Sequence, residues 1–353
     1  MSKAAICVVV PVYKAMATLD RCVESVLAQQ VEGGLTCILV DDGSPDESGA
    51  LCDAWAAKDD RVTVIHQDDL GVSGARNSGL AAADSEFIVF LDSDDALRPG
   101  ALQAALTAQR AAPQDFVVWH YTTDEKDPAA VTADAEPRTQ AGLARLWLDC
   151  LLAMPWNKLY RADLAKQLQF DVQYTLGEDL QFVLDYIALL GQTVPEFGYR
   201  VMTSPLTFYD CSRGGTLSTR YHANYCDIWP KHFAKLNAAC HAAACPAEDM
   251  RPLHRAELQV FAEGVADIMR RDPSPTQRLK GYKAAAALRS PWLRALLERM
   301  KIEGCYSAYY LPCRWHNVGL VCRVDEARRA NAPLYGKLDW AGYYLLLGRM
   351  RRD

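Results

Sequence analysis

The segment FIVFLDSDD, residues Phe87–Asp95, decides the fold, because five apolar residues run directly into an acidic cluster. An unbroken apolar run of this length is typical of a strand that is buried on both faces of a parallel sheet. In open parallel sheets, ligands bind beyond the carboxyl ends of the strands. The segment therefore predicts a buried strand with a polar site directly after it.

Runs of the same character repeat before and after this segment, and helix-like stretches separate them. The predicted strands are Ile6–Val10, Leu35–Val40, Arg61–His66, Phe87–Leu91 and Phe116–His120. The predicted helices are Thr18–Gln30, Ser48–Lys58, Ala75–Ala83 and Gly100–Ala111. Apolar strands that alternate with helices favour an α/β sandwich with right-handed crossovers. We therefore expect a Rossmann-like α/β sandwich with a mainly parallel central sheet.

The pattern changes twice further along the chain. Residues 122–140 are rich in Ala, Asp, Thr and Pro and show no clear period, which predicts a loop or insertion. An amphipathic helix is predicted at Ala141–Ala153, followed by a short apolar segment at Trp156–Tyr160. A second helix and a strand near Val201–Tyr209 come next. From about Asn224 onward the patterns are helical only, as at Glu257–Arg271 and Trp292–Lys301. We therefore expect one domain over residues 1–223 and a helical C-terminal domain over residues 224–353.

The net charge of −6 is unevenly distributed. Residues 251–353 contain 19 Lys and Arg and 10 Asp and Glu, a net charge of +9, so residues 1–250 carry −15. A basic C-terminal domain suggests an anionic partner such as a membrane surface; solvated helices that happen to be basic are an equal alternative. The last segment, Trp340–Arg352, joins an apolar aromatic stretch to a basic end. It fits an interfacial helix, but core packing of a terminal helix is the more common explanation of such a segment.

Most of the twelve cysteines are interpreted as small buried hydrophobes. Several lie inside apolar runs, such as Cys7 and Cys37, and the absence of a CxxC pair argues against a zinc cluster. No window holds the roughly 18 apolar residues that a membrane-spanning helix needs. The N-terminus lacks the charged region, apolar segment and cleavage site of a signal peptide, so we expect a cytoplasmic protein.

Functional side chains are concentrated after the first four predicted strands. The segments are Pro11-Val12-Tyr13, Asp41-Asp42-Gly43-Ser44, Gly71–Asn77 and Asp92–Asp95. One acidic turn would mean little, because Asp is common in turns, but two Asp clusters at corresponding strand ends are harder to dismiss. Carboxylates beside an anion site need a cation, and oxygen ligands suit Mg²⁺ or Mn²⁺, which also hold phosphates. The strand ends therefore predict a divalent metal next to a phosphate-bearing ligand.

A series of short motifs makes this more specific. In chain order they are PVYK, VDDGS, GVSGARNSGL and FLDSDD, then WNKLY at Trp156–Tyr160, LGEDL at Leu176–Leu180 and YDCSRGGTLS at Tyr209–Ser218. This series resembles family 2 glycosyltransferases with the GT-A fold, of the type that builds bacterial surface or capsular polysaccharides. The resemblance covers roughly residues 4–220. It implies a catalytic domain with a nucleotide-sugar half at about 1–120 and an acceptor half at about 141–223.

The resemblance also implies which residues bind the nucleotide. Pro11 and Tyr13 should border the base, with Tyr13 near its face, although packing at the sheet edge is an alternative for Tyr13. Asp42 should accept a hydrogen bond from the uracil edge, and Arg76 should help to hold that base. Uracil is the base that these two residues favour, and other bases stay open. Lys14 stands where the family often has Asn, which affects only the local turn.

The same resemblance implies the residues of the chemistry. Asp92 is expected near the ribose or the metal, and Asp94 as the direct ligand of Mn²⁺ or Mg²⁺. Asp179 is similar to the family's catalytic base, which deprotonates the acceptor hydroxyl for a single inverting displacement. Glu178 is a second candidate base that more plausibly orients a neighbour. A carboxylate pair at a helix N-terminus, favoured by the helix dipole, is the structural alternative for both.

On the acceptor side, the resemblance implies Trp156, Asn157 and Lys158. An aromatic ring packs well against a sugar, and Asn and Lys offer hydrogen-bond donors. Arg213 is a candidate for the diphosphate by analogy only. Arg314-Trp315 is not preceded by the Gln of the processive synthases' Gln-x-x-Arg-Trp motif. This difference favours addition of a single sugar.

We therefore expect an inverting, metal-dependent hexosyl- or N-acetylhexosaminyltransferase. Its donor would be a nucleotide-sugar, most plausibly a UDP-sugar, and its acceptor a glycan or a lipid-linked saccharide on the inner membrane face; nucleic acid is not expected as a partner. A dinucleotide-binding oxidoreductase is excluded because no GxGxxG follows the first strand, and the Walker motif is also absent. A non-catalytic protein that binds nucleotide-sugars or glycans on the same fold is the main alternative, and a retaining transferase is a smaller one.

Overall fold

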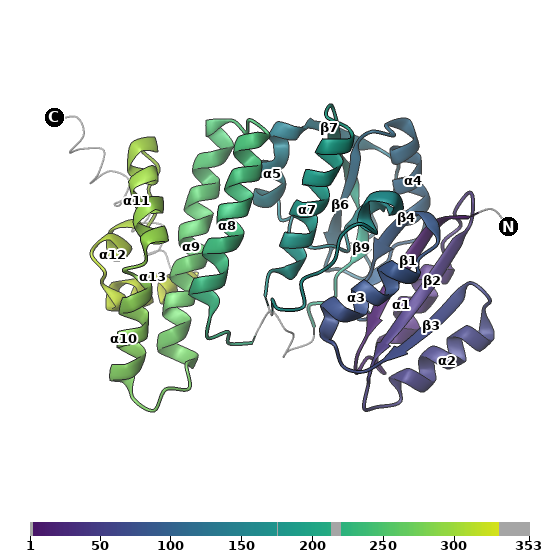
Figure 1. The fold of residues 1–353 in the computed structure, drawn as a ribbon, viewed down its shortest axis with the longest axis horizontal. Helices are drawn as coiled ribbons and strands as arrows, with labels where there is room; N and C mark the ends of the chain where they lie inside the picture. Colours follow the sequence, from purple (N-terminus) through teal and green to yellow (C-terminus); the bar gives the residue numbers. More distant parts are fainter. Residues whose placement is uncertain (1–2, 175, 213–219, 332–353) are drawn as a thin grey trace. The chain divides into compact units, whose positions relative to one another are not determined.

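The computed structural model of this protein describes residues 3–174, 176–212 and 220–331 (Figure 1). The chain divides into two compact units, Met1–Gly214 and Gly215–Asp353, which are described separately. The predicted domain boundary between residues 223 and 224 stays a prediction. The segment Trp340–Arg352, interpreted above as an interfacial or packed helix, lies outside the described residues.

The first unit begins with four parallel strands that alternate with helices (Figure 1). The strands are β1 (Ala4–Val12), β2 (Leu35–Asp42), β3 (Val62–Gln67) and β4 (Ser85–Phe90), and the helices are α1 (Leu19–Leu27), α2 (Ser48–Lys58) and α3 (Gly71–Ala82). They pair in the order β3-β2-β1-β4, with every pair parallel. After Ala4, every residue of β1 is buried, as expected for a strand covered on both faces.

The rest of the first unit extends the same sheet. Its elements are β5 (Ala96–Leu97), α4 (Ala101–Ala111), β6 (Phe116–Thr122), β7 (Ala135–Thr139), η1 (Gln140–Gly142), α5 (Leu143–Leu148), β8 (Lys158–Arg161), α6 (Ala162–Ala165), α7 (Glu178–Thr193) and β9 (Gly198–Phe208). The strand order continues from β4 through β8, β6 and β9 to β5, with β7 beside β9. Strand β8 runs antiparallel to both β4 and β6.

The structure confirms the α/β fold class and refines it in two places. The sheet is parallel where strands alternate with helices and between β6 and β9, but β8 runs antiparallel to β4 and β6, and β5 and β7 run antiparallel to β9. The predicted loop at residues 122–140 contains β7, an edge strand with the polar sequence AEPRT. Polar residues and Pro137 are tolerated there because an edge strand leaves backbone groups facing solvent. The predicted helix Ala141–Ala153 is shorter, ending in α5 at Leu148.

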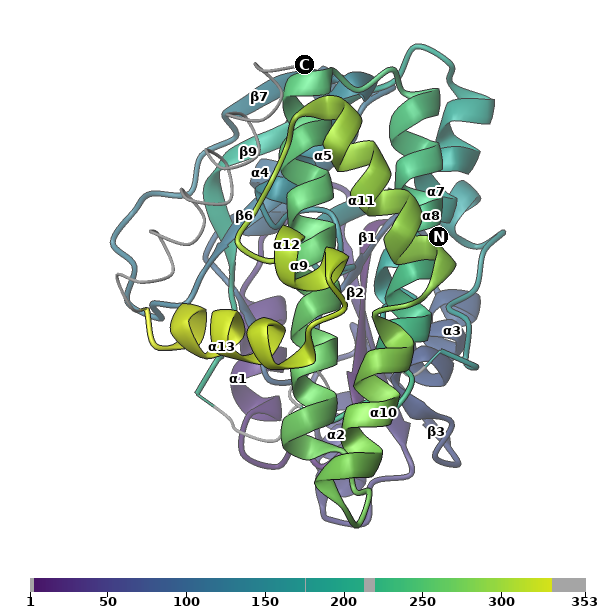
Figure 2. The same ribbon diagram turned by 90° about the vertical axis from the view of Figure 1, so that its left-hand side faces the viewer.

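The second unit is helical throughout its described part. Its helices are α8 (Tyr225–Ala242), α9 (Ala247–Arg271), α10 (Gln277–Ala287), α11 (Pro291–Glu303), α12 (Tyr310–Arg314) and α13 (Val318–Arg329). Helix α9 is central and packs against α8, α10, α11 and α13 (Figure 2). Its apolar side contributes Leu258, Phe261 and Val265 to a core shared with α11 and α13. Among the described helices, none combines the length and the apolar character needed to cross a membrane.

The cysteines lie as the apolar pattern predicted. Seven of the twelve are buried, and all twelve are free thiols. Cys7 and Cys37 lie on the central strands β1 and β2 with no exposed surface. Burial raises the pKa of the Cys7 thiol to about 11, so it remains a neutral, apolar core group.

Candidate active site

The segments that follow β1, β2 and β4 meet at one edge of the sheet. The register pairs Val12 of β1 with Asp41 of β2, and Val9 of β1 with Phe90 of β4. The Tyr13 turn, the Asp41-Asp42 pair and the Asp92–Asp95 cluster therefore share the carboxyl edge of the parallel strands, as predicted. Helix α7 brings Asp179 to the same place, because Asp179 and Asp92 contact a single Arg76 side chain.

Arg76 connects the two carboxylates that the sequence assigned to metal and base. Its Nη1 donates to Asp179 Oδ1 at 2.6 Å, and its Nη2 donates to Asp92 Oδ1 at 2.8 Å. The Arg76 side chain is only 3% exposed. Burial alone would favour the neutral form, but Asp179 and Asp92 raise the pKa of Arg76, which keeps its charge. The guanidinium therefore pairs with two carboxylates, and its predicted contact with a nucleotide base stays a prediction.

Asp179 stands in the first turn of α7, where the helix dipole favours a negative charge. The turn before it depends on Gly177, which has a φ of +77° that other residues rarely adopt. Burial raises the pKa of Asp179 to about 7; Arg76 and Lys158 oppose this rise, while Glu178 and Asp92 add to it. The side chain is still 29% exposed, so a ligand can reach it. A carboxylate with a pKa near neutrality suits proton abstraction at physiological pH.

The Asp92–Asp95 cluster fits a divalent cation. Asp92 and Asp94 are half-buried, and Asp95 is fully buried. Asp95 Oδ1 accepts from the backbone N–H of Asp210 at 2.9 Å, whereas its Oδ2 is buried without a hydrogen-bond partner in the part of the chain that the structure describes. Burial and the charge of Asp92 raise the pKa of Asp95 to about 9. A bound cation would offset the mutual repulsion of these carboxylates, so the residues present suit Mg²⁺ or Mn²⁺.

Asp42 is held inside the sheet edge. Its Oδ1 accepts from the Gln67 side chain at 2.6 Å and from the Leu70 backbone N–H at 3.0 Å. Only 3% of the residue is exposed. These bonds link β2 to the loop before α3, so Asp42 shapes the wall of the site. Contact with a base would require its second carboxylate oxygen.

The turn after β1 presents Tyr13. Pro11 is buried within β1, while Tyr13 is 43% exposed and stands at the edge where a base would lie. The ammonium group of Lys14 is 4.8 Å from the centre of the Tyr13 ring. Lys14 adopts a φ of +53°, a conformation that Asn tolerates better than Lys. This explains in physical terms why Asn suits the position.

The predicted acceptor residues Asn157 and Lys158 are buried structural groups. Both have no exposed surface. Lys158 Nζ donates to the carbonyls of Leu151 and Met154 and to Asn157 Oδ1, at 2.5 to 2.7 Å. Asn157 Nδ2 donates to the carbonyls of Trp119 and Leu151. These contacts hold the chain entering β8 and use the donors that were expected to reach an acceptor.

The Trp156 side chain is also mostly covered, at 3% exposed. It stacks on Tyr209, with ring centres 5.4 Å apart, and meets the edge of Tyr121. Glu178, beside the base, is half-buried and adds to the raised pKa of Asp179. Glu178 is therefore still accessible to a ligand, whereas Trp156, Asn157 and Lys158 are buried. Arg213, the candidate for the diphosphate, lies outside the described residues.

Arg21 is a part of the site that the sequence interpretation missed. From α1, its Nη2 donates to the Asp94 carbonyl and to Asp210 Oδ2, both at 2.6 Å. It thereby ties the acidic loop after β4 to the end of β9. Asp95 was predicted only as the last member of the Asp92–Asp95 cluster, without a role of its own. Asp95 ends the FLDSDD motif and Arg21 lies outside the quoted motifs, and the partners of both residues lie 73 to 189 residues away.

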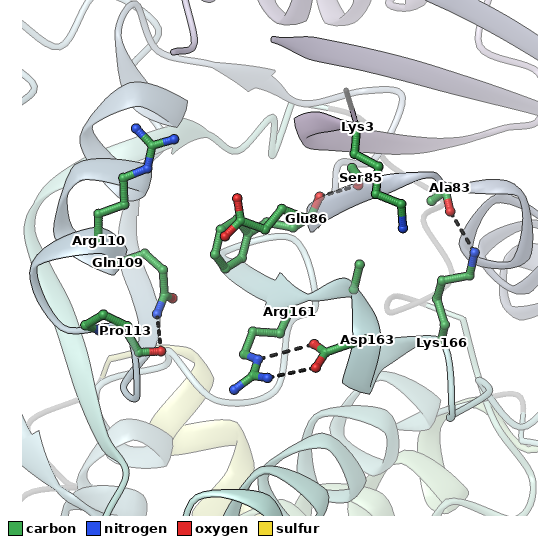
Figure 3. A pocket seen from close by; sticks show the side chains of 12 residues that line it. Lys3, Ala83, Ser85, Glu86, Gln109, Arg110, Pro113, Arg161, Asp163 and Lys166 are labelled. Atoms are coloured by element: carbon green, nitrogen blue, oxygen red, sulfur yellow. Dashed lines mark hydrogen bonds and ion pairs between the residues drawn. The ribbon is translucent and has the colours of Figure 1, made fainter. Parts of the chain in front are cut away.

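A separate cavity of about 810 Å³ lies away from these carboxylates. It is lined by Ser85 and Phe87 of β4 and by Arg110, Arg161 and Lys166 among others (Figure 3). Arg161 pairs with Asp163, and Lys166 donates to the Ala83 carbonyl. Because Ser85 begins β4 and Asp92 follows its end, the cavity and the candidate site lie at opposite ends of that strand. The cavity is therefore not the donor site.

Comparison with known proteins finds sequence relatives for part of this chain. The profile described as glycosyl transferase family 2 matches residues 7–169. Glycosyltransferase GlyG of Streptococcus pneumoniae is 39% identical over 124 residues, an alignment that covers 35% of this chain and 41% of GlyG. The chain thus spans less than half the length of that relative.

Solved structures extend the likeness to the whole fold. S. aureus TarS 1–349, in complex with UDP-GlcNAc, superposes with a TM-score of 0.60 at 16% identity, over 93% of this chain and 92% of TarS 1–349. The mannosyltransferase PcManGT from Pyrobaculum calidifontis, in complex with GDP-Man and Mn²⁺, gives a TM-score of 0.50 at 17% identity, over 90% of this chain and 87% of PcManGT. At these identities the likeness shows a shared fold.

Proposed function

We propose that this chain is a family 2 glycosyltransferase that moves a single sugar from a nucleotide-sugar to an acceptor hydroxyl, with inversion and with a divalent metal, as the profile match over residues 7–169 and the similarity to GlyG support. One observation carries the proposal. Arg76 holds Asp92, on the donor side, and Asp179, the candidate base, at 2.8 and 2.6 Å from one guanidinium. Two carboxylates from distant parts of the chain are thereby held in one site.

In the proposed reaction, Asp179 takes the proton of the acceptor hydroxyl. Its raised pKa makes it a better proton acceptor than an ordinary aspartate, while Arg76 fixes Oδ1 and leaves the rest of the carboxylate to face the acceptor. The hydroxyl oxygen then attacks the anomeric carbon, and the bond from that carbon to the diphosphate breaks. Attack opposite the leaving group inverts the anomeric configuration.

Asp94 is the proposed metal ligand, with Asp92 beside it. When bound there, Mg²⁺ or Mn²⁺ would offset the charge that develops on the departing diphosphate. The raised pKa and the unpartnered Oδ2 of Asp95 support a cation in this cluster. The presence of Mn²⁺ with GDP-Man in PcManGT, which shares the fold, agrees with this choice.

A UDP-sugar is the proposed donor. TarS, which has the same fold, binds UDP-GlcNAc. Tyr13 would lie against the base, with Pro11 shaping the turn beneath it and Asp42 meeting the uracil edge through its second oxygen. Arg76 would support the donor side by holding Asp92. Trp156, Asn157 and Lys158 are proposed to shape the acceptor side from beneath without touching the sugar.

We propose a glycan or lipid-linked saccharide as acceptor, reached at the inner membrane face through the basic C-terminal unit. Residues 251–353 carry a net charge of +9. Exposed apolar side chains on α10, Leu279 and Tyr282, would accompany that charge at a lipid surface. Flotation of the full chain with anionic and with zwitterionic vesicles tests this idea. Equal recovery of the protein with anionic and with zwitterionic vesicles would contradict binding to an anionic membrane.

Thermal unfolding with Mn²⁺ and a panel of nucleotide-sugars tests donor binding. A ligand at about 100 times its Kd should stabilise the protein by roughly 2.7 kcal/mol. We expect one UDP-sugar to stabilise the wild type, and Asp94→Ala to lose that response. Asp84→Ala is the matched control, because Asp84 is an exposed carboxylate just before β4, at the opposite end of that strand. If no nucleotide-sugar stabilises the wild type with or without metal, the alternative of a glycan-binding protein becomes the better one.

A further inference from the structure

Three metal-ligating side chains of different chemistry converge in the second unit. His254 lies within α9, Glu303 is the last residue of α11, and Cys305 follows two residues later. One candidate ligand atom from each lies within 4.8 Å of the others. His254 is 1% exposed and Cys305 is 6% exposed, while Glu303 is half-buried and opens the cluster to solvent. The cluster is separate from the acidic residues of the first unit.

The backbone between Glu303 and Cys305 places both side chains at α9. Gly304 ends α11 with a φ of +64°, which reverses the chain within one residue, and the Cys305 N–H donates back to the Met300 carbonyl at 2.9 Å. Glu303 Oε2 then lies 2.7 Å from His254 Nδ1 and 3.5 Å from Cys305 Sγ. The position of both groups is therefore fixed by a helix-ending turn.

Hydrogen bonds on the Nε2 side of the His254 ring favour the tautomer in which Nδ1 can bind a metal. His254 Nε2 lies 3.2 Å from Asn237 Oδ1. The Asn237 amide is oriented by its own Nδ2, which donates to Glu257 Oε1 at 2.7 Å and to the Phe233 carbonyl at 2.9 Å. If Nε2–H donates to Asn237, the lone pair of Nδ1 faces Glu303 and Cys305. Metal-bound histidines commonly have such a partner on the other ring nitrogen.

A metal-free arrangement of the same residues competes with this one. Arg299 Nη1 is 3.2 Å from His254 Nε2 and could donate to it. The ring proton would then lie on Nδ1, and Glu303 Oε2 would accept from both Nδ1–H and the Cys305 thiol. The two arrangements differ in one respect that can be measured, which is whether a cation replaces the protons between the three side chains.

We propose that His254 Nδ1, Glu303 and Cys305 Sγ form a binding site for a borderline divalent cation of the zinc class. Imidazole, carboxylate and thiolate are the ligands that Zn²⁺ uses, with water completing a tetrahedron. One thiolate and one carboxylate neutralise the 2+ charge, which limits the cost of burial. As the metal–sulfur bond forms, the thiol proton leaves to solvent.

Both distances from Glu303 Oε2 come near this geometry, and the third, from His254 Nδ1 to Cys305 Sγ, is at most 4.8 Å. Metal–ligand bonds of about 2.0–2.3 Å place tetrahedral ligands about 3.3–3.8 Å apart. The Sγ–Oε2 distance of 3.5 Å lies in that range, and the Nδ1–Oε2 distance of 2.7 Å must lengthen by about 0.7 Å. Rotation of the half-buried Glu303 side chain provides this. The ligands lie 49 residues apart, so a search for CxxC spacing could not find them.

Titration of the chelator-treated full chain with Co²⁺ tests the site, because a cobalt–thiolate bond gives a charge-transfer band that oxygen ligands do not give. We expect the band to saturate at about one Co²⁺ per chain and to be displaced by Zn²⁺. Cys305→Ser and His254→Gln should each weaken Co²⁺ binding at least tenfold, with Cys305→Ser abolishing the band.

Two controls separate this site from others in the protein. Cys313→Ser removes another buried thiol of the same unit and should keep the band. Asp94→Ala disables the proposed donor-site metal and should also keep it, so this test is independent of the sugar transfer. No thiolate band in the wild type, or a band that persists in Cys305→Ser, overturns the proposal. If Cys305→Ser does not fold, His254→Gln and the Zn²⁺ content of purified wild type decide, and a Zn²⁺ content at background contradicts the site.

Discussion

Arg76 Nη1 lies 2.6 Å from Asp179 Oδ1, which joins a residue of α3 to the candidate base 103 positions later in the chain. The same guanidinium holds Asp92. The acceptor-side base and the donor-side carboxylate are thus fixed to each other by one buried cation. In this account Arg76 is a positioning residue, and its loss should affect both the fold and the reaction.

Removal of Arg76 should be costly for stability. Arg76→Met leaves Asp92 and Asp179 without their partner, and breaking a buried ion pair costs about 3 kcal/mol or more. The two carboxylates are each 29% exposed, so solvent should reduce the loss somewhat. Urea unfolding monitored by circular dichroism measures it. Arg110→Met, which removes a half-exposed arginine paired with Glu32, should change stability by less than about 1 kcal/mol. A loss at Arg76 no larger than at Arg110 would refute its structural role.

The transfer rate should depend on pH through Asp179. The base must be ionised to accept a proton, so kcat/KM should fall as the pH drops below about 7, roughly tenfold per pH unit. Because Arg76 lowers the pKa of Asp179 in the wild type, Arg76→Met should move this limb to higher pH. A pH profile of kcat/KM for both proteins tests this. A wild-type profile that stays flat down to about pH 5 would contradict the assigned pKa.

Lys158 should behave as a structural residue. Lys158→Met removes a donor from the carbonyls of Met154 and Leu151, of which Leu151 keeps only the Asn157 amide, and this should cost about 1–3 kcal/mol. Burial lowers the pKa of Lys158, and the charge of Asp179 opposes this shift. The KM for the acceptor, measured on the folded variant, should stay within about threefold of the wild type. A large rise in the acceptor KM with unchanged stability would instead indicate that Lys158 contacts the acceptor. Lys126→Met, at an exposed loop position, is the control.

Lys14 should be replaceable with a gain in stability. A left-handed conformation costs an ordinary residue about 1 kcal/mol, and Asn tolerates it better. Lys14→Asn should therefore stabilise the protein by about 0.5 kcal/mol, or about 1–2 °C in Tm. Lys126→Asn, at a loop position without a positive φ, should give no gain. Equal effects of the two substitutions would exclude the conformational explanation.

The sequence predicted the features that are local in the chain. The strands β1, β2 and β4 and the carboxylates after them were found because burial on both faces produces unbroken apolar runs, and because parallel strands end at one edge. The Asp179 turn was found through a short motif. Strand β7 was missed because an edge strand of polar residues with Pro137 has the composition of a loop.

What the sequence could not predict depends on partners far along the chain. Lys158 has the residue type of an exposed donor, and only the fold shows that its ammonium group meets the carbonyls of Leu151 and Met154. Arg76 lies in the motif GVSGARNSGL, and only the fold shows that its guanidinium forms ion pairs with Asp92 and Asp179. The role of Arg21 requires the contact between α1 and the end of β9. Such pairings follow from the tertiary structure and leave no periodic signal.

The central claim is that Asp179 is the base of a sugar transfer for which Asp94 holds the metal. The most direct test measures UDP release from the stabilising UDP-sugar, with Mn²⁺ and a panel of glycan acceptors, for wild type and Asp179→Asn. We predict that the variant loses about 10²–10⁴-fold in kcat, while its donor Kd, measured by thermal unfolding, stays within about threefold of the wild type. Turnover by Asp179→Asn at the wild-type rate would contradict the account.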